Sequence, residues 1–370
     1  MIPVNRPLFS GNELKYLTEC INTGWISSEG PFIQKFEKNF AKDVDRKFGI
    51  AVSSGSAALD IAIRALEIGP GDEVIVSTFT IISAVQSIVS SGAIPVLVDS
   101  DQSTWNMDVS QIESKITKKT RAILVVHIYG LPADIQPVMD ICKNYNLKLI
   151  EDAAEMHGQT YYNQPCGSFG DISTFSFYPN KTITTGEGGM VVTNSEELNV
   201  RARKLRNLAF EPNKRRFVHY EIGWNYRMTN LQAALGLAQL EKVDLHIKRK
   251  RQIGLVYYDE LQTDDKFELP ILNTKYSDNI FWVFGLLAKE HHYAEAMVNI
   301  LRRNKIGTRP FFWCMHEQPV FRKMGLFLND KFPNAEKLSR NGFYLPSGIG
   351  LLDHEILEVI KIFNNAVKLC

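Results

Sequence analysis

The stretch AILVVHIYGLPADIQPVMDICKNYNLKLIEDAAE, residues 122–155, carries the pattern that decides the fold. Two apolar runs, at 122–127 and 148–152, flank a helical pattern at 134–145. Neither run alternates with polar residues, so each predicts a strand that is buried on both faces. The helical segment between them is long enough to connect two parallel strands. The stretch therefore predicts one strand–helix–strand unit of a parallel sheet that is covered by helices.

The same pattern extends toward the N-terminus. Further apolar runs stand at 50–52, 73–77 and 94–99, and helical candidates at 57–66, 80–91 and 108–117. Strands that alternate with helices in this way are typical of an α/β fold. We therefore predict a large domain built on a mainly parallel sheet with helices on its faces.

Near residue 229 the pattern changes. Thr229-Asn230-Leu231-Gln232 resembles a helix start, and apolar positions then recur at helical spacing to about Leu261. A helix of that length is long enough to connect two domains, and the remainder mixes a strand pattern at 281–287 with helices. We predict a large domain over 1–243, with the N-terminal segment included, and a small α+β domain over 244–370.

The composition excludes several classes of protein. Of the 370 residues 45% are hydrophobic, and 42 basic and 41 acidic residues leave a net charge of +1. This balance argues against a nucleic-acid-binding protein and against an acidic disordered one. The basic run at 248–251 lies inside a helical pattern, which predicts a solvated helix face. No apolar stretch is long enough to span a bilayer, and the first residues lack the layout of a signal peptide.

The cysteines are an odd number without CxxC spacing, at Cys20, Cys142, Cys166, Cys314 and Cys370. This pattern fits neither a disulfide framework nor a zinc module, and no HExxH motif is present. The sequence therefore predicts reduced thiols, a cytoplasmic location and no metal site.

Polar residues follow the first predicted strand, in the turn Ser53-Ser54-Gly55-Ser56, which opens directly into a helix. Free amides at a helix N-terminus, together with a glycine and hydroxyls, make a phosphate cradle. A serine that only caps the helix is the alternative interpretation. The turn has neither the GK[ST] ending of a Walker loop nor the GxGxxG of a dinucleotide site, so both interpretations stay open.

A pair of acidic residues, Glu151-Asp152, ends the apolar run at 148–152. A buried carboxylate needs a partner, because leaving it unpaired is costly. One interpretation is an N-cap for a following helix. The other is a carboxylate that holds a cationic ligand atom, such as a protonated ring nitrogen. The pair by itself does not decide between them.

The segment FSFYPNKTITTGEGGMVVT, residues 175–193, adds a strand, Lys181, a glycine-rich turn and a second strand. A lysine beside apolar and aromatic residues has a lowered pKa and becomes an amine nucleophile. Ser176 can offer a hydroxyl to a phosphate. A phosphate cradle, Asp152 and Lys181 in this order are the parts needed to hold pyridoxal phosphate: the helix terminus takes the phosphate, Asp152 the ring nitrogen, and Lys181 forms the Schiff base.

The sequence resembles the DegT/DnrJ/EryC1/StrS family of sugar-nucleotide aminotransferases, which have the aspartate-aminotransferase-like fold type I. The resemblance runs nearly end to end and rests on SSGSAAL, GDEVIVSTFT, EDAAE, FSFYPNKTITTGEGGM, GWNYRMTNLQAALGLAQLE and TRPFFWCMHEQP. It implies a pyridoxal-phosphate enzyme with an α/β large domain and a smaller C-terminal α+β domain.

The resemblance also implies roles for single residues. Lys181 matches the Schiff-base lysine, Asp152 the partner of the ring nitrogen, and Ser176 the phosphate site. The remaining cofactor matches are the turn Gly55-Ser56-Ala57 at the phosphate, Ala154 against one ring face, and Glu155 near the ring hydroxyl.

Three further matches concern the partner subunit and the substrate. Asn225 matches a residue that reaches the phosphate from the neighbouring subunit, which implies a homodimer with shared active sites. Arg309 and His316 match positions near the sugar-nucleotide pocket. Ile81 departs from the family pattern, because an aromatic residue often stacks on the cofactor at this position; the contact is then aliphatic or falls to another residue such as Phe79.

The implied reaction moves the amino group of L-glutamate to C4 of a nucleotide-linked 4-keto-6-deoxyhexose, for O-antigen or another surface polysaccharide. Within the family, the motifs most resemble those of GDP-perosamine synthases. The alternatives are the viosamine-type dTDP-sugar 4-aminotransferases, the C3 sugar aminotransferases and a non-catalytic regulator. A dehydratase branch carries histidine where this chain has Lys181, so lysine favours transamination.

Overall fold

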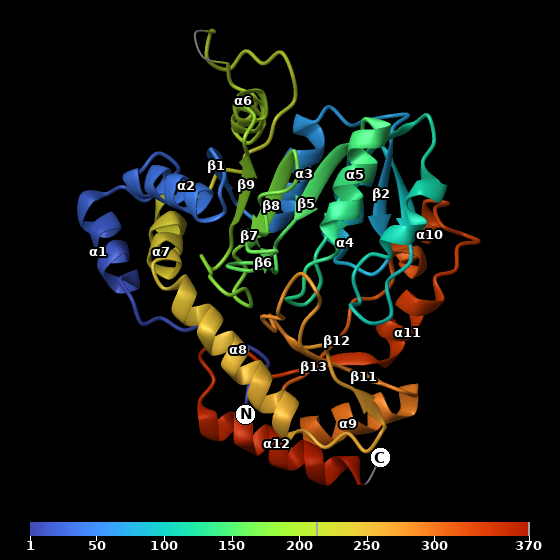
Figure 1. Ribbon diagram of the computed structural model, residues 1–370. Helices are drawn as coiled ribbons and strands as arrows, with labels where there is room; N and C mark the ends of the chain where they lie inside the picture. Colours follow the sequence, from blue (N-terminus) through green and yellow to red (C-terminus); the bar gives the residue numbers. More distant parts are fainter. Residues whose placement is uncertain (212–213, 369–370) are drawn as a thin grey trace.

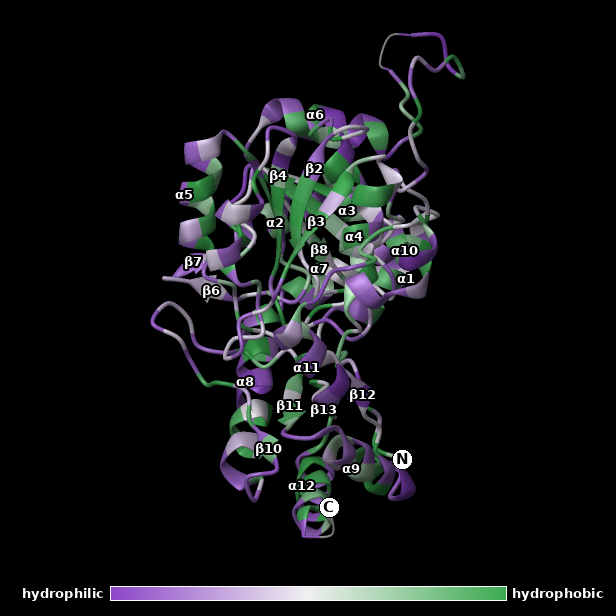
Figure 2. Ribbon diagram, turned by 90° about the vertical axis from the view of Figure 1, so that its right-hand side faces the viewer, coloured by the Kyte–Doolittle hydropathy of each residue, from purple (hydrophilic) through white to green (hydrophobic). Residues whose placement is uncertain are grey.

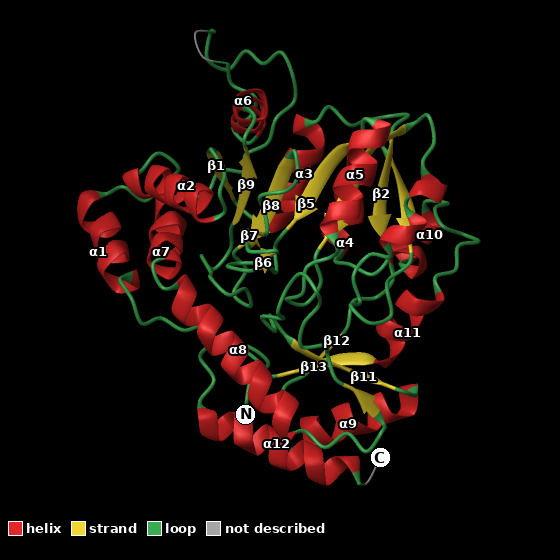
Figure 3. Ribbon diagram, viewed as in Figure 1, coloured by secondary structure: helices red, strands yellow, loops and turns green. Residues whose placement is uncertain are grey.

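The computed structural model describes residues 1–211 and 214–368 and is built around a seven-stranded sheet (Figures 1 and 3). The strand order is β1-β9-β8-β5-β4-β2-β3, and β9 alone runs in the opposite direction to the other six strands. The strands are β1 (Phe48–Val52), β2 (Glu73–Ser77), β3 (Ile94–Val98), β4 (Thr120–Val126), β5 (Lys148–Asp152), β8 (Ile172–Ser176) and β9 (Gly189–Thr193). The predicted mainly parallel sheet is confirmed.

Helices cover both faces of this sheet, which explains why its strands are continuous apolar runs. Along β2, for example, Val74 and Val76 belong to one core cluster and Ile75 belongs to the other. Figure 2 shows the inner strands as hydrophobic and the covering helices as mixed. These helices are α1 (Glu13–Thr23), α2 (Pro31–Asp43), α3 (Gly55–Ala65), α4 (Ile82–Ser90), α5 (Ile135–Tyr145), α6 (Glu196–Leu205) and α7 (Asn230–Leu240). A short hairpin of β6 (Thr160–Tyr161) and β7 (Gln164–Pro165) follows β5.

The helix predicted at 108–117 is wrong. The segment forms two 3₁₀ turns, Val109–Gln111 and Glu113–Lys115. The Asp108 carboxylate accepts hydrogen bonds from the Ser110 backbone and the Gln111 side chain, and the Gln111 side chain accepts one from the Asp99 amide. Such bonds between side chains and nearby backbone compete with helical hydrogen bonds, so the turn does not extend into an α-helix.

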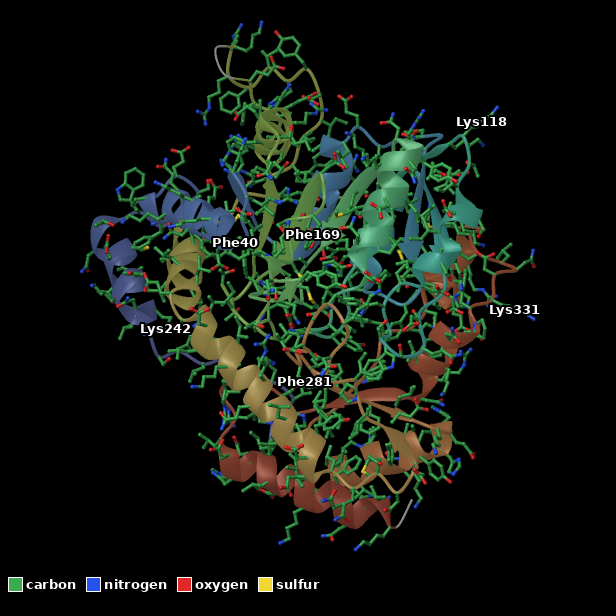
Figure 4. The ribbon with its side chains drawn as sticks, in the orientation of Figure 1. Phe40, Lys118, Phe169, Lys242, Phe281 and Lys331 are labelled. Carbon is green, nitrogen blue, oxygen red and sulfur yellow. The ribbon has the colours of Figure 1, made fainter. Side chains whose placement is uncertain are left out.

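The single helix predicted from 229 to about 261 is two helices, α7 and α8 (Val243–Glu260). Thr229 begins α7 as predicted, with a capping box that pairs it with Gln232. The break lies at Lys242, which is labelled in Figure 4. The sequence has no glycine or proline there that would predict the end of a helix. The Glu241 carboxylate there accepts hydrogen bonds from Asn12 and Tyr16, so contacts with the N-terminal segment hold this corner.

A second, four-stranded antiparallel sheet lies below the first in Figure 1, with the order β10-β11-β13-β12. Its strands are β10 (Phe267–Glu268), β11 (Phe284–Ala288), β12 (Arg309–Pro310) and β13 (Gly342–Leu345). The accompanying helices are α9 (His291–Arg303), α10 (Pro319–Lys323), α11 (Pro333–Asn341) and α12 (Asp353–Val367), with a 3₁₀ turn at Met315–Glu317. Ile2 bridges to Ile306 and packs into the core of this part. The predicted division at 243/244 stays a proposal.

The basic run at 248–251 is not the solvated helix face that the pattern predicts. Lys248 is exposed, but Lys250 is buried, and its ammonium donates to the carbonyl oxygens of Trp282 and Ser347. The prediction is wrong because this part of α8 packs against other segments of the chain. The Lys250 side chain points into that contact instead of into solvent.

Two sequence predictions concern cysteines and membranes. Cys20, Cys142, Cys166 and Cys314 are buried free thiols, and Cys370 lies outside the described residues. Among the described helices, none combines the length and the apolar character that crossing a bilayer requires.

Candidate active site

A cavity of about 410 Å³ opens at the carboxyl ends of the parallel strands, between the two sheets. Such edges are where α/β sheets bind ligands. The cavity collects most of the sequence-predicted residues, namely Gly55, Ser56, Ile81, Asp152, Ala154, Glu155, Ser176 and Lys181. They come from the start of α3, the residue before α4, the end of β5 and the turn after it, and the end of β8 and the turn after it.

One end of the cavity has the character of a phosphate cradle. The Gly55 and Ser56 amides begin α3, where helical geometry supplies no acceptor, and none is found for them in the described part of the chain. A Cβ on Gly55 would lie 2.8 Å from the Ser176 Cβ, so only glycine permits this approach. The capping interpretation of the turn is confirmed, because Ser54 caps α3 by accepting from the Ala57 amide, and the phosphate-cradle interpretation stays a prediction that the free Gly55 and Ser56 amides support. That bond occupies the Ala57 amide.

The two adjacent acidic residues at the end of β5 have different environments. Glu151 is fully buried, and its carboxylate accepts hydrogen bonds from the turn after β7 and from β8, through the Gly167, Phe169 and Gly170 amides and the Ser173 hydroxyl. It also bonds His127 Nε2, which carries the proton because His127 Nδ1 accepts from the Ala133 amide. Despite burial, these donors hold the pKa of Glu151 below its usual range. Glu151 is therefore a structural anchor.

Asp152 points into the cavity instead, because successive strand residues face opposite sides. No helix follows it, so the N-cap interpretation is wrong. Its carboxylate accepts from the Ala154 amide at 3.1 Å, and burial raises its pKa. A buried carboxylate with so few hydrogen-bond donors is stabilised by a nearby positive charge. A protonated ring nitrogen would supply that charge.

Lys181 and Glu155 form a buried pair in the same cavity. The Lys181 amine lies 3.6 Å from a Glu155 carboxylate oxygen and 4.0 Å from the centroid of the Trp282 ring. The other oxygen of Glu155 accepts from the Tyr129 amide at 2.7 Å. Burial lowers the pKa of Lys181 and raises the pKa of Glu155 to about 7. A larger fraction of the Lys181 amine is therefore neutral and nucleophilic at a given pH than in an exposed lysine.

This donor set fits pyridoxal phosphate. Free helix-terminal amides and the Ser56 and Ser176 hydroxyls would hold the phosphate, and the unmatched Asp152 carboxylate would hold the ring nitrogen. Glu155 would lie near the ring hydroxyl, and Lys181 supplies the amine. These assignments remain proposals for the individual residues, while the cavity brings all of them together.

Four predicted residues do not line this cavity: Ala57, whose amide the Ser54 cap occupies, Asn225, Arg309 and His316. The exposed Asn225 accepts hydrogen bonds from the Arg227 side chain, and Arg309 is exposed on β12, where it pairs with the cavity residue Tyr344. His316 is buried, with its ring nitrogens 2.8 Å from the Thr78 hydroxyl and 3.2 Å from a Glu336 oxygen. In the described part of a single chain, neither Asn225 nor His316 lines the cavity.

Two other features bear on sequence predictions. Phe79 is fully buried in an aromatic cluster outside the cavity, so it does not replace the aromatic residue missing at Ile81, which lines the cavity itself. His316, Glu317 and Glu336 have ligand atoms within 4.8 Å of one another. The Arg340 guanidinium already bonds Glu317 at 2.6 Å, and this positive charge disfavours a metal ion there.

Sequence reasoning missed several residues of the cavity wall: Leu59, Ser83, Val126, Tyr178, Asn180, Glu187, Trp282, Phe312 and Tyr344. Tyr178 and Asn180 lie within three residues of Lys181, and this proximity in the sequence could have predicted that they line the cavity. Trp282, Phe312 and Tyr344 come from the distant small sheet and its connections. No local pattern marks them, because only the tertiary fold brings them to the strand ends.

Substitution separates the two acidic residues. Glu151→Gln turns an amide group toward backbone donors, and we expect the free energy of unfolding to fall by about 2–3 kcal/mol at neutral pH. Because the folded pKa of Glu151 is lowered, this deficit should shrink as the pH falls through that pKa. Asp152→Asn should leave stability nearly unchanged and weaken cofactor binding. Urea unfolding and cofactor absorbance check both, and a fully stable Glu151→Gln variant would contradict the assignment.

Glu155→Gln should lower the pKa of Lys181 further. The Glu155 carboxylate stabilises the ammonium, so its removal leaves burial to act with less opposition. The test is the pH dependence of Lys181 acetylation in cofactor-free protein, followed by peptide mass spectrometry, with the exposed Lys248 as an internal control. The reactivity midpoint of Lys181 should move to lower pH. An unchanged midpoint would show that the pair does not set the reactivity of Lys181.

Comparisons with known proteins agree with this site. The sequence model of the DegT/DnrJ/EryC1/StrS aminotransferase family matches residues 8–364. The chain is 42% identical to a GDP-perosamine synthase from Escherichia coli O157:H7, over 98% of both chains. It is 41% identical to one from Vibrio cholerae, over 99% of both.

Solved structures give the same result. The aminotransferase TlmJ from Streptoalloteichus hindustanus superposes with a TM-score of 0.92 at 26% identity, covering 100% of this chain and 99% of that one. DesV from S. venezuelae, solved with a ketimine intermediate, gives 0.89 at 30% identity, over 96% of this chain and 94% of that one. The family match spans nearly the whole chain, and the cavity brings together Lys181, Asp152, Glu155 and the free amides at the start of α3. The chain belongs to the DegT/DnrJ/EryC1/StrS aminotransferase family and is a pyridoxal-phosphate-dependent aminotransferase.

Proposed function

We propose that this aminotransferase moves the amino group of L-glutamate to C4 of a nucleotide-linked 4-keto-6-deoxyhexose, with GDP-perosamine as the product. The observation that carries the aminotransfer is the buried Lys181 amine beside Glu155 and Asp152 in one cavity. The choice of sugar is supported by three GDP-perosamine synthases that are 41–42% identical over nearly the full chain.

The residues of the cavity divide the work of such a reaction. Pyridoxal phosphate, when bound, supplies an electron sink for the charge left on the substrate carbon after a proton is removed. Asp152 keeps a proton on the ring nitrogen, which maintains that sink. The lowered pKa of Lys181 lets its nitrogen take a proton from the substrate carbon and deliver it again. Trp282, Phe312 and Tyr344 cover the strand ends and exclude water from the reacting atoms.

Two alternatives are supported by other relatives. A dTDP-4-dehydro-2,3,6-trideoxy-D-glucose 4-aminotransferase from Saccharopolyspora spinosa is 31% identical over the full chain, which supports a dTDP-linked substrate such as the viosamine precursor. A pleiotropic regulatory protein from Geobacillus stearothermophilus is 34% identical over 86% of the chain. A regulator has no need for a buried amine between two acids, so the intact cavity favours catalysis.

The test is release of 2-oxoglutarate from glutamate, with GDP-4-keto-6-deoxymannose and dTDP-4-keto-6-deoxyglucose assayed in parallel. Turnover with the GDP sugar alone supports the proposal. Turnover with the dTDP sugar alone keeps the cavity assignments and replaces the substrate. A yellow protein that is inactive with both would contradict the proposed substrate class.

Lys181→Ala should abolish turnover in this assay, because no other amine in the described part of the chain lines the cavity. The variant should still fold, since the Lys181 side chain carries no structural hydrogen bond and is replaced by a smaller group at the cavity wall. Circular dichroism and the unfolding midpoint are the controls. Measurable turnover in folded Lys181→Ala would contradict the mechanism.

A homodimer with shared active sites is part of the proposal. The described residues between α6 and α7 project away from the large sheet in Figure 1, and among them Phe217, Tyr220 and Ile222 are 73%, 67% and 79% exposed. Exposed apolar side chains on a projecting segment favour a partner. Asn225 at the end of this segment lies outside its own cavity, as a residue that serves the neighbour's site would.

Mixed dimers test the sharing of sites. Lys181→Ala and Asn225→Ala should each be poorly active alone, and a dimer of one with the other contains one site with both native residues. Co-refolding the two variants should therefore restore up to about a quarter of the parent activity, the share expected for random pairing in a twofold dimer. No recovery from correctly mixed dimers would show that Asn225 serves its own subunit.

The product and the compartment follow from the same proposal. A 4-amino-4,6-dideoxy sugar nucleotide is a building block for O-antigen or another surface polysaccharide. The four buried free thiols support a reducing compartment such as the cytoplasm.

A further inference from the structure

Lys250 is a buried lysine that the reaction does not use. Its residue is 2% exposed in the middle of α8, and its ammonium donates to the Trp282 carbonyl and to the Ser347 carbonyl, both at 2.6 Å. Trp282 stands just before β11, and Ser347 follows β13. One side chain therefore ties α8 to two separate segments of the small sheet.

Burying a lysine ammonium without a carboxylate partner costs free energy, because the charge loses its hydration. In the described part of the chain the only charged group that acts on it is Lys181, which is also a cation. Burial lowers the pKa of Lys250 to about 7. Packing alone would be served by an apolar side chain of the same length, so the two hydrogen bonds are the property that distinguishes lysine here.

Trp282 connects this junction with the active site. Its indole ring lies over the Lys181 amine, with 4.0 Å between the amine nitrogen and the ring centroid. Its ring N–H donates to the Asn180 carbonyl at 2.9 Å, immediately before Lys181 in the chain. The backbone of Trp282 is thus held by Lys250, while the ring edge is held by the loop that carries Lys181.

The neighbouring residue shows that this segment is tightly constrained. Phe281, labelled in Figure 4 beside α8, has a backbone φ of 51°, which is rare for a side chain with a Cβ. Its amide donates to the Asn279 side chain at 2.7 Å, and a Cβ on Gly254 of α8 would lie 2.2 Å from its ring. Gly254 stands one helical turn after Lys250. The two α8 residues therefore hold Phe281 and Trp282 from the same stretch of helix.

We propose that Lys250 is a positioning residue for transamination: by holding the Trp282 carbonyl, it keeps the indole over the Lys181 nitrogen and so sets the protonation and reactivity of that nitrogen. An aromatic face stabilises a cation above it, so the indole favours the protonated nitrogen. Loss of the correct placement should lower the pH at which this nitrogen gives up its proton. A small displacement of a group at the reacting atoms also costs rate.

The test compares Lys250→Met, which keeps the length of the four-carbon stem and removes the ammonium donors, with Lys250→Arg, which keeps charge and donors. Lys248→Met on the exposed side of the same run is the matched control. In cofactor-bound enzyme, the pH midpoint of the visible absorption band reports protonation of the Lys181 nitrogen. Loss of the Lys250 charge alone would raise this midpoint, because Lys250 and Lys181 are both cations, whereas loss of the indole placement lowers it. For Lys250→Met we therefore expect a fall of up to about one unit, and a rise would contradict the proposal. The value of kcat should fall about tenfold or more, with a smaller change in KM for glutamate.

A double substitution shows whether Lys250 acts through Trp282. Trp282→Phe should move the same midpoint in the same direction, and Lys250→Met combined with Trp282→Phe should shift it no further than the larger single effect. Lys250→Arg should restore most of the parent midpoint. Additive shifts would overturn the proposal, and so would a folded Lys250→Met enzyme with the parent midpoint. If Lys250→Met does not fold, an unchanged midpoint in Trp282→Phe overturns it instead.

The inference rests on the proposed function only for the substrate used to measure kcat. If the parent enzyme turns over neither keto sugar, the proposed substrate fails, while the absorption midpoints of the same variants still decide the role of Lys250.

Discussion

Burial of two successive carboxylates at the end of β5 is the constraint on which the rest of the structure depends. Because neighbouring strand residues face opposite sides, Glu151 and Asp152 cannot share one set of donors. Glu151 receives amides, a hydroxyl and the His127 ring, and these bonds fix the turn between β7 and β8 against β5. Asp152 is left with the Ala154 amide and an open cavity. One carboxylate stabilises the fold, and the other is available for a cation.

The second constraint is the way the two sheets meet. The elements around the large sheet supply the free α3 amides, the acids and Lys181, whereas the small sheet and its connections supply the aromatic wall. Helix α8 runs from one part to the other, as Figure 1 shows, and its buried Lys250 donates to the backbone just before β11 and just after β13. Placement of Trp282 over Lys181 is therefore a property of the whole assembly of helices and sheets, not of the loop that carries Lys181.

The sequence predicts much of this arrangement, for physical reasons that differ between elements. Strands such as β2 and β4 are recognisable because burial on both faces demands continuous apolar runs. Asp152, Ser176 and Lys181 are recognisable because they stand at strand ends, where a parallel sheet gathers its ligands. The corner at Lys242 and the burial of Lys250 are not, since contacts with residues far away in the chain decide both. The role of Glu151 cannot be predicted from the sequence either. An acidic residue at a strand end gives the same sequence pattern whether protein hydrogen-bond donors or a bound ligand stabilise its charge.

The most direct test of the central claim is reduction of the yellow, cofactor-bound enzyme with borohydride, followed by proteolysis and mass spectrometry of the labelled peptides. A single pyridoxyl label is expected on Lys181, because among the described residues it supplies the one lysine amine that lines the cavity with Asp152 and the free amides of α3. A label on another lysine, such as the buried Lys250, or no label in a protein that keeps its yellow colour, would contradict it.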